Sequence, residues 1–142
     1  MITVNFIKQC EQAEELQRAW RPKDLDTFCY TKSREIGQAC IDNKKRTQKE
    51  YDENLKHQFC IFSLEQLFEI AHKAYNKNAH YKSKEYEIIA DFIDWMLNSD
   101  IDKYKDFNLD FDDTKSCLLI YIMEEFYNKI WNGKDWQISK EE

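Results

Sequence analysis

The side chains best placed to do chemistry in this 142-residue chain are carboxylates between residues 91 and 113. This segment holds eight aspartates against two lysines, so its net charge is −6. The aspartates are Asp91, Asp94, Asp100, Asp102, Asp106, Asp110, Asp112 and Asp113. Carboxylates along a folded surface steer the protein towards a basic cleft on a partner. Carboxylates that are spaced like phosphates also compete with nucleic acid for such a cleft. The segment therefore predicts a partner with a basic surface; the alternative is an ordinary solvated loop.

Two patterns resemble metal sites, and neither is complete. Asn108, Asp110 and Asp112 begin like an EF-hand loop, whose alternating oxygens converge on calcium. The sixth position is Asp113 where a glycine is needed, and the twelfth is Leu119 where a bidentate glutamate is needed. The three histidines lack zinc-ligand spacing, and no cysteine pair completes a zinc site. They are His57, His72 and His80. We expect no metal and no cofactor.

Enzyme chemistry also lacks a complete set of residues. His57 lies three residues before Cys60, but Cys60 stands among large apolar residues and is expected to be a buried, inert thiol. The adjacent carboxylates Glu124-Glu125 and Asp112-Asp113 point about 100° apart on a helix, so they do not share a site. Two glycines in the whole chain cannot form a phosphate-binding loop. No catalytic residue is predicted.

One basic cluster offers an alternative site for nucleic acid. It consists of Lys44, Lys45, Arg46 and Lys49. Four acidic residues lie among and beside these cations, which weakens attraction to phosphates. A solvated surface is the favoured interpretation, and direct nucleic-acid binding is the alternative.

The composition limits the class of protein. The chain has 21 Lys and Arg against 27 Asp and Glu, with two glycines and one proline. The longest apolar run, residues 117–123, is too short to span a bilayer, and the N-terminus lacks a leader pattern. Five widely spaced cysteines are typical of free thiols in a reducing cytoplasm. We expect a single domain over residues 1–142 that does not enter a membrane.

Apolar spacing and turn residues in the first half predict a helix followed by a small sheet. The helix is expected over residues 5–20. Two short strands are expected within residues 25–41, joined by a polar hairpin connection at 32–35. Residues 42–57 are charged without apolar periodicity, which predicts an exposed loop or surface helix, and a third strand is expected over residues 58–62.

The second half is predicted to hold three helices. Ser63 and Gln66 match a capping box that starts the first. The second has an apolar stripe that we expect to be buried: Tyr86, Ile89, Ala90, Ile93, Met96 and Leu97. The third is apolar on almost every side as far as Ile130, and Asn132-Gly133 is expected to end it. The predicted fold is mostly helical α+β, with about four helices around this central C-terminal helix and a small antiparallel sheet or hairpin from the N-terminal half.

Three stretches carry a resemblance to known proteins. The tail FYNKIWNGKDW, residues 126–136, has an aromatic-x-K-x-W-x-G-x-x-W pattern, and AWRPK (19–23) and CIFSLEQL (60–67) add weaker matches. In these stretches the chain resembles small proteins encoded by phages and prophages of low-GC bacteria. The resemblance implies provenance and brings no catalytic residues. The matching positions are interpreted as structural: Trp20, Pro22, Lys129, Trp131, Gly133 and Trp136.

These observations together favour a binding protein. We expect a non-enzymatic phage or prophage accessory protein that binds a basic surface on a host protein in the bacterial cytoplasm. An anti-defence inhibitor, anti-CRISPR-like, whose acidic surface mimics nucleic acid is the most concrete version. The alternatives are a small nucleic-acid-binding protein that uses residues 44–49, and a small enzyme with a pocket near His72, His80 or the cysteines.

Overall fold

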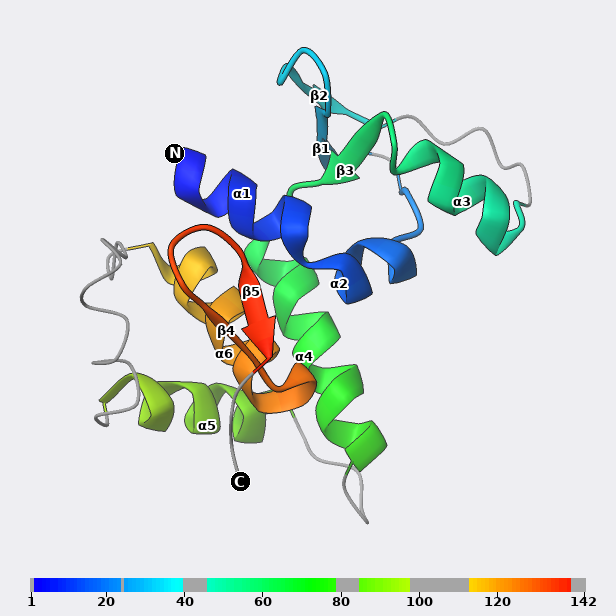
Figure 1. Ribbon diagram of the computed structural model, residues 1–142. Helices are drawn as coiled ribbons and strands as arrows, with labels where there is room; N and C mark the ends of the chain where they lie inside the picture. The colour runs from blue at the N-terminus through cyan, green and yellow to red at the C-terminus, as the bar shows by residue number, and fades with distance from the viewer. Residues whose placement is uncertain (1, 24, 40–45, 79–84, 98–112, 139–142) are drawn as a thin grey trace. The chain divides into compact units, whose positions relative to one another are not determined.

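The computed structural model describes residues 2–23, 25–39, 46–78, 85–97 and 113–138 (Figure 1). The fold of this part is mixed α+β and mainly helical, as predicted. The chain divides into two compact units, which we call the N-terminal unit (residues 1–62) and the C-terminal unit (residues 63–142). None of the described helices is long and apolar enough to cross a membrane.

The N-terminal unit begins with two short helices where one was predicted. Helix α1 spans Val4–Gln12 and α2 spans Glu14–Ala19. Thr3 caps α1, because its Oγ1 accepts a hydrogen bond from the Phe6 N–H at 3.1 Å. The break falls at the fully buried Ala13, whose φ of −80° and ψ of 69° lie outside the helical region. The prediction of one continuous helix over residues 5–20 is therefore wrong.

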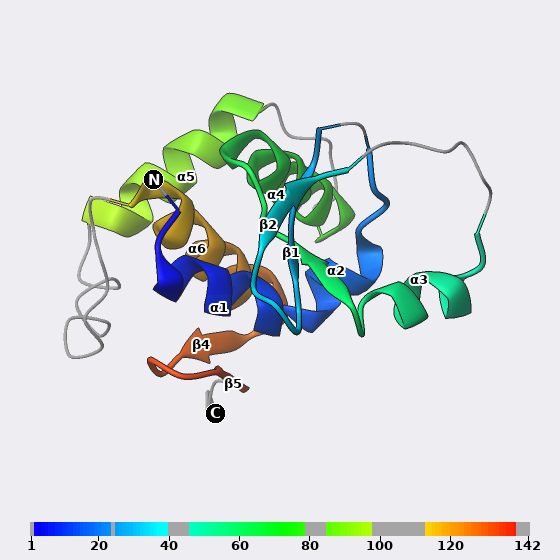
Figure 2. The same cartoon turned by 90° about the horizontal axis from the view of Figure 1, so that it is seen from above.

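A three-stranded antiparallel sheet follows, and its strands lie where the sequence predicts them. Strands β1 (Thr27–Tyr30), β2 (Ile36–Gln38) and β3 (Gln58–Cys60) are arranged in the order β2-β1-β3. Phe28 is paired with Gly37 on one side and with Cys60 on the other. Helix α3, Gln48–Asn54, is the predicted surface helix and has no buried residue (Figure 2).

The side chain of Gln17 joins the elements on both sides of the break. It is 4% exposed, and its Nε2 donates hydrogen bonds of 2.8 Å to the carbonyl oxygens of Cys10 and Cys60. Its Oε1 accepts a third bond of 2.8 Å from the Cys60 N–H. One amide therefore joins α1, α2 and β3. We call these contacts the amide hub.

The C-terminal unit contains three longer helices: α4 (Leu64–Asn78), α5 (Glu85–Leu97) and α6 (Thr114–Tyr127). The capping box is confirmed, because the Gln66 N–H donates to Ser63 Oγ at 3.1 Å and the Ser63 N–H donates to Gln66 Oε1 at 2.7 Å. Every residue from 116 to 123 of α6 is buried. Helix α6 contacts both α4 and α5 (Figures 1 and 2), so it is the central helix of this unit, as predicted.

Helix α6 ends earlier than predicted and leads into a hairpin. Asn128 closes it in the left-handed region at φ 56°, and Asn132-Gly133 instead lies in the turn between β4 (Lys129–Trp131) and β5 (Trp136–Ile138). In that turn Asn132 Oδ1 accepts hydrogen bonds from the N–H groups of Lys134 and Asp135, at 2.8 and 2.9 Å. Trp131 is fully buried and packs on Trp136, with ring centroids 5.0 Å apart.

The buried face of α5 also differs from the prediction. Ile88, Phe92 and Trp95 are the buried residues, between 1% and 4% exposed. The rings of Phe92 and Trp95 lie 5.4 and 5.6 Å from the ring of Tyr121 on α6. The helix is apolar on two adjacent faces, and aromatic packing selects the one that carries the larger rings. The prediction that Ile89, Ile93 and Leu97 are buried is therefore wrong.

Candidate functional site

The described part of the acidic segment begins with a row of carboxylates on α5. Glu87, Asp91 and Asp94 are four and three residues apart, so they follow one side of the helix; we call them the acidic row. Asp91 and Asp94 are exposed and Glu87 is half-buried. Helix α5 contains no basic residue. Sequence reasoning named Asp91 and Asp94 and missed Glu87, which the same helical spacing would have revealed.

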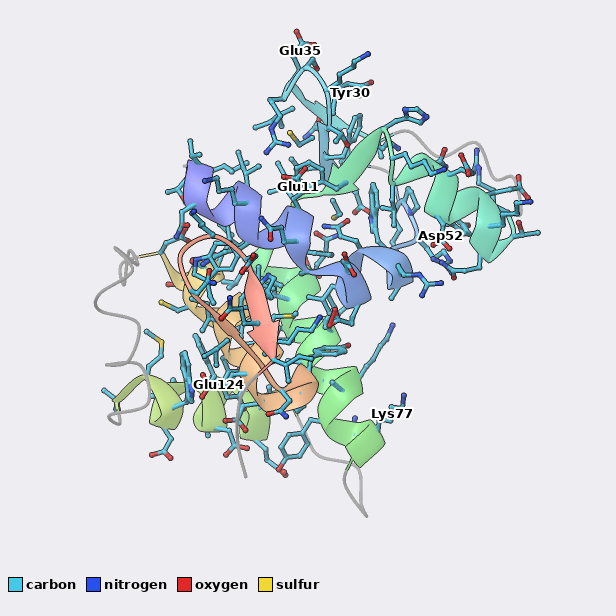
Figure 3. All side chains as sticks on the ribbon, in the orientation of Figure 1. Glu11, Tyr30, Glu35, Asp52, Lys77 and Glu124 are labelled. Carbon is cyan, nitrogen blue, oxygen red and sulfur yellow. The ribbon has the colours of Figure 1, made fainter. Side chains whose placement is uncertain are left out.

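The negative charge of the acidic row reaches the neighbouring helix α6. Burial raises the pKa of the Tyr121 phenol, and the negative charges of Asp91 and Glu125 raise it further. Both carboxylates therefore lie near the same hydroxyl. Glu125 is exposed, and the preceding residue Glu124 is labelled in Figure 3. The acidic surface of the C-terminal unit thus draws on two helices, although sequence reasoning had set Glu124-Glu125 aside.

An exposed apolar stripe lies beside the acidic row. Ile89, Ile93 and Leu97 are 40%, 48% and 82% exposed. They are spaced four residues apart and form one ridge along α5, which we call the apolar stripe. Exposed apolar residues are ordinary when scattered singly, whereas three in one ridge are typical of an interaction surface.

The other predicted acidic residues divide into two groups. Asp113 caps α6, since its Oδ1 accepts a hydrogen bond of 3.4 Å from the Ser116 N–H. Its carboxylate therefore has a structural task, as its position before a helix predicts. Five others lie outside the described residues, together with the incomplete calcium loop. They are Asp100, Asp102, Asp106, Asp110 and Asp112.

The alternative basic patch is only partly described, and its setting is mixed in charge. Lys49 is exposed on α3 and Arg46 is half-buried, whereas Lys44 and Lys45 lie outside the described residues. The same helix carries acidic residues that are already paired. Asp52 is 3.4 Å from Arg18, and Glu53 is 2.9 Å from Lys56. A phosphate approaching Lys49 would meet these carboxylates as well.

The candidate nucleophile is buried, whereas its candidate base is exposed. Cys60 is fully buried, and its N–H and carbonyl are bonded to Gln17, whereas His57 is exposed. The thiol of Cys29 is also buried, and burial raises its pKa even though Arg34 acts in the opposite direction. The thiol of Cys29 therefore favours the protonated, unreactive form.

The described histidines and carboxylates do not gather into a metal site. His72 lies 3.2 Å from the side-chain amide of Asn76 on the next turn of α4. His80 lies outside the described residues. In the part of the chain that the structure describes, no three His, Cys, Asp or Glu side chains are placed to hold a metal ion.

Comparison with protein-family models, with curated proteins and with solved structures finds no match for this chain.

Proposed function

We propose that this protein is a non-enzymatic binding protein whose acidic surface on α5 docks on a basic surface of another protein. The acidic row is the observation that carries the proposal, because its three carboxylates follow one side of a helix whose own sequence holds no Lys or Arg. Such a one-sign surface steers association and disfavours partners of the same sign.

The most concrete version is an anti-defence inhibitor of phage or prophage origin that occupies the nucleic-acid channel of a host protein. An α-helix rises about 1.5 Å per residue, so the row from Glu87 to Asp94 carries one charge about every 5 Å. A nucleic-acid strand carries one charge per roughly 3.4 Å of duplex axis. The two densities are similar enough for a channel built for phosphates to accept the row. The resemblance to phage and prophage proteins supports the choice of a bacterial host protein.

Capture from a bacterial lysate tests the proposal, with the tagged full-length chain as bait. A protein held through a nucleic-acid channel should be retained at low salt and released by heparin or by double-stranded DNA. The charge-reversal variant E87K/D91K/D94K should no longer capture it. The matched control E35K/E65K/E69K makes the same change in net charge at exposed sites on the β1–β2 connection and on α4, and should capture it as the natural chain does.

Three results would overturn the proposal. The first is equal capture by the natural chain and the α5 variant, and the second is no capture at low salt. The third is direct binding to DNA or RNA in a low-salt gel shift that Lys49→Glu removes, which would favour the nucleic-acid-binding alternative instead.

A further inference from the structure

The arrangement of side chains around α5 indicates more than a charged surface. Each residue turns the helix by about 100°. Going round the axis, the buried face of Ile88 and Phe92 is followed by the apolar stripe, then by the exposed Ala90, and then by the acidic row. Over residues 87–97, whose side chains the structure describes, the surface of α5 therefore presents an apolar ridge with the acidic row along one flank.

We propose that this surface binds an amphipathic helix of the partner protein, with the helix's apolar face on the stripe and its lysines or arginines against the acidic row. The inference rests on the proposed function and specifies which part of a basic surface is recognised. A ridge of residues four apart fits between the corresponding ridges of a second helix, at a crossing angle of about −50°. The small Ala90 lets the two backbones approach beside the stripe.

Charge decides between this occupant and a second copy of the same chain. Helix α5 carries Glu85, Glu87, Asp91 and Asp94 without a single Lys or Arg. Packing two copies through this ridge would bring the carboxylates of both together, and like charges facing each other oppose association. A helix with basic flanks gains attraction from the same carboxylates.

Binding to synthetic peptides tests the inference. The probe is a helical peptide of about 18 residues, five turns, with leucines on one face and lysines on the other. The first control peptide has the same composition in scrambled order, and the second has glutamate in place of lysine. Fluorescence anisotropy should show binding of the leucine–lysine helix, and at least about tenfold weaker binding of either control.

Three variants of the full chain separate the two contributions. I93S/L97S should weaken binding of the leucine–lysine peptide about tenfold or more. L64S/I138S removes two other exposed apolar side chains of the C-terminal unit and should leave binding unchanged. E87Q/D91N/D94N should weaken binding and flatten its dependence on salt.

The possible failures are distinguishable from one another. If I93S/L97S binds the peptide as tightly as the natural chain, the stripe has no role and this inference fails while the proposed function stands. If E87Q/D91N/D94N binds the peptide unchanged, the acidic row does not hold the lysines and this inference fails; the proposed function fails only if E87K/D91K/D94K still captures the host protein. A fall of several degrees in the melting temperature of I93S/L97S would show that the chain itself covers the stripe, and a dimer lost on Leu97→Asp in sedimentation would show that a second copy does; either result overturns the inference.

Discussion

The two units of this protein are stabilised in different ways. In the N-terminal unit, elements of three to nine residues meet at the amide hub, where Gln17 makes three hydrogen bonds of 2.8 Å. In the C-terminal unit, eight consecutive buried residues of α6 pack against longer helices. Short elements bury little apolar surface, so hydrogen-bond geometry matters more in the first unit and side-chain volume matters more in the second. The same kind of substitution should therefore have different effects in the two units.

The largest effect is expected from removing volume in α6. Leu119→Ala should lower the free energy of unfolding by about 3–5 kcal/mol, because Leu119 is fully buried and its loss leaves a cavity. Leu119→Met conserves volume and should cost less than about 1.5 kcal/mol. Urea unfolding followed by circular dichroism measures both. Equal losses would show that volume is not what stabilises the C-terminal unit.

At the amide hub, a substitution that conserves side-chain volume should still destabilise the fold. Gln17→Met keeps the length of the side chain but removes all three hydrogen bonds, one accepted from the Cys60 N–H and two donated to the carbonyls of Cys10 and Cys60. We expect a loss of about 2–4 kcal/mol in urea unfolding, since buried peptide groups then lose their partner. The exposed Gln38 gives the matched control, and Gln38→Met should change stability by less than about 0.5 kcal/mol. Similar losses of stability for Gln17→Met and Gln38→Met would show that hydrogen-bond geometry at the hub does not stabilise the N-terminal unit.

A smaller effect is expected at the β4–β5 turn. Gly133 has a φ of 95°, a backbone conformation that residues other than glycine rarely adopt. Gly133→Ala should cost about 1 kcal/mol, and the loss should appear in the exchange of the hairpin amides with solvent. Unchanged exchange would mean that the turn relaxes to another geometry without cost.

The smallest effect concerns a surface ion pair of the N-terminal unit. A hydrogen bond from Gln48 lowers the pKa of the Asp52 carboxyl below its ordinary value near 3.8, and the bond and charge of Arg18 add to this (Figure 3). A lowered folded-state pKa stabilises the fold above the unfolded pKa, and this contribution is lost as the pH falls through the folded value. Gln48→Ala should raise the pKa in a titration followed by NMR. An unchanged pKa would rule out Gln48 as its main cause.

Local signals in the sequence predicted many of the elements of the fold. The capping box at Ser63 and Gln66 located the start of α4, and β-branched and aromatic residues around a polar connection located β1 and β2. These signals succeed because each is complete within a few residues. The break at Ala13 has no such signal, and the bonds of Gln17 beside it reach a strand 43 residues further along the chain.

The surface of α5 shows where sequence reasoning about the site reached its limit. Spacing placed Asp91 and Asp94 on one helix, but it could not tell which apolar face of that helix is buried. Ile89, Ile93 and Leu97 match a helical stripe as well as Ile88, Phe92 and Trp95 do. The choice depends on the position of Tyr121, which belongs to another helix. That the exposed stripe and the acidic row form one surface is seen only in the folded structure.

The tryptophans give each unit its own optical signal. Trp131 and Trp136 lie 5.0 Å apart with their rings tilted by 58°, a separation at which the electronic transitions of two indoles couple and produce paired bands in circular dichroism. Loss of those bands reports unfolding of the C-terminal unit. Trp20, whose indole N–H donates to Asp26 at 2.9 Å, belongs to the N-terminal unit. With the other three tryptophans replaced by phenylalanine, its fluorescence reports that unit alone, so each unit can be followed without an added label.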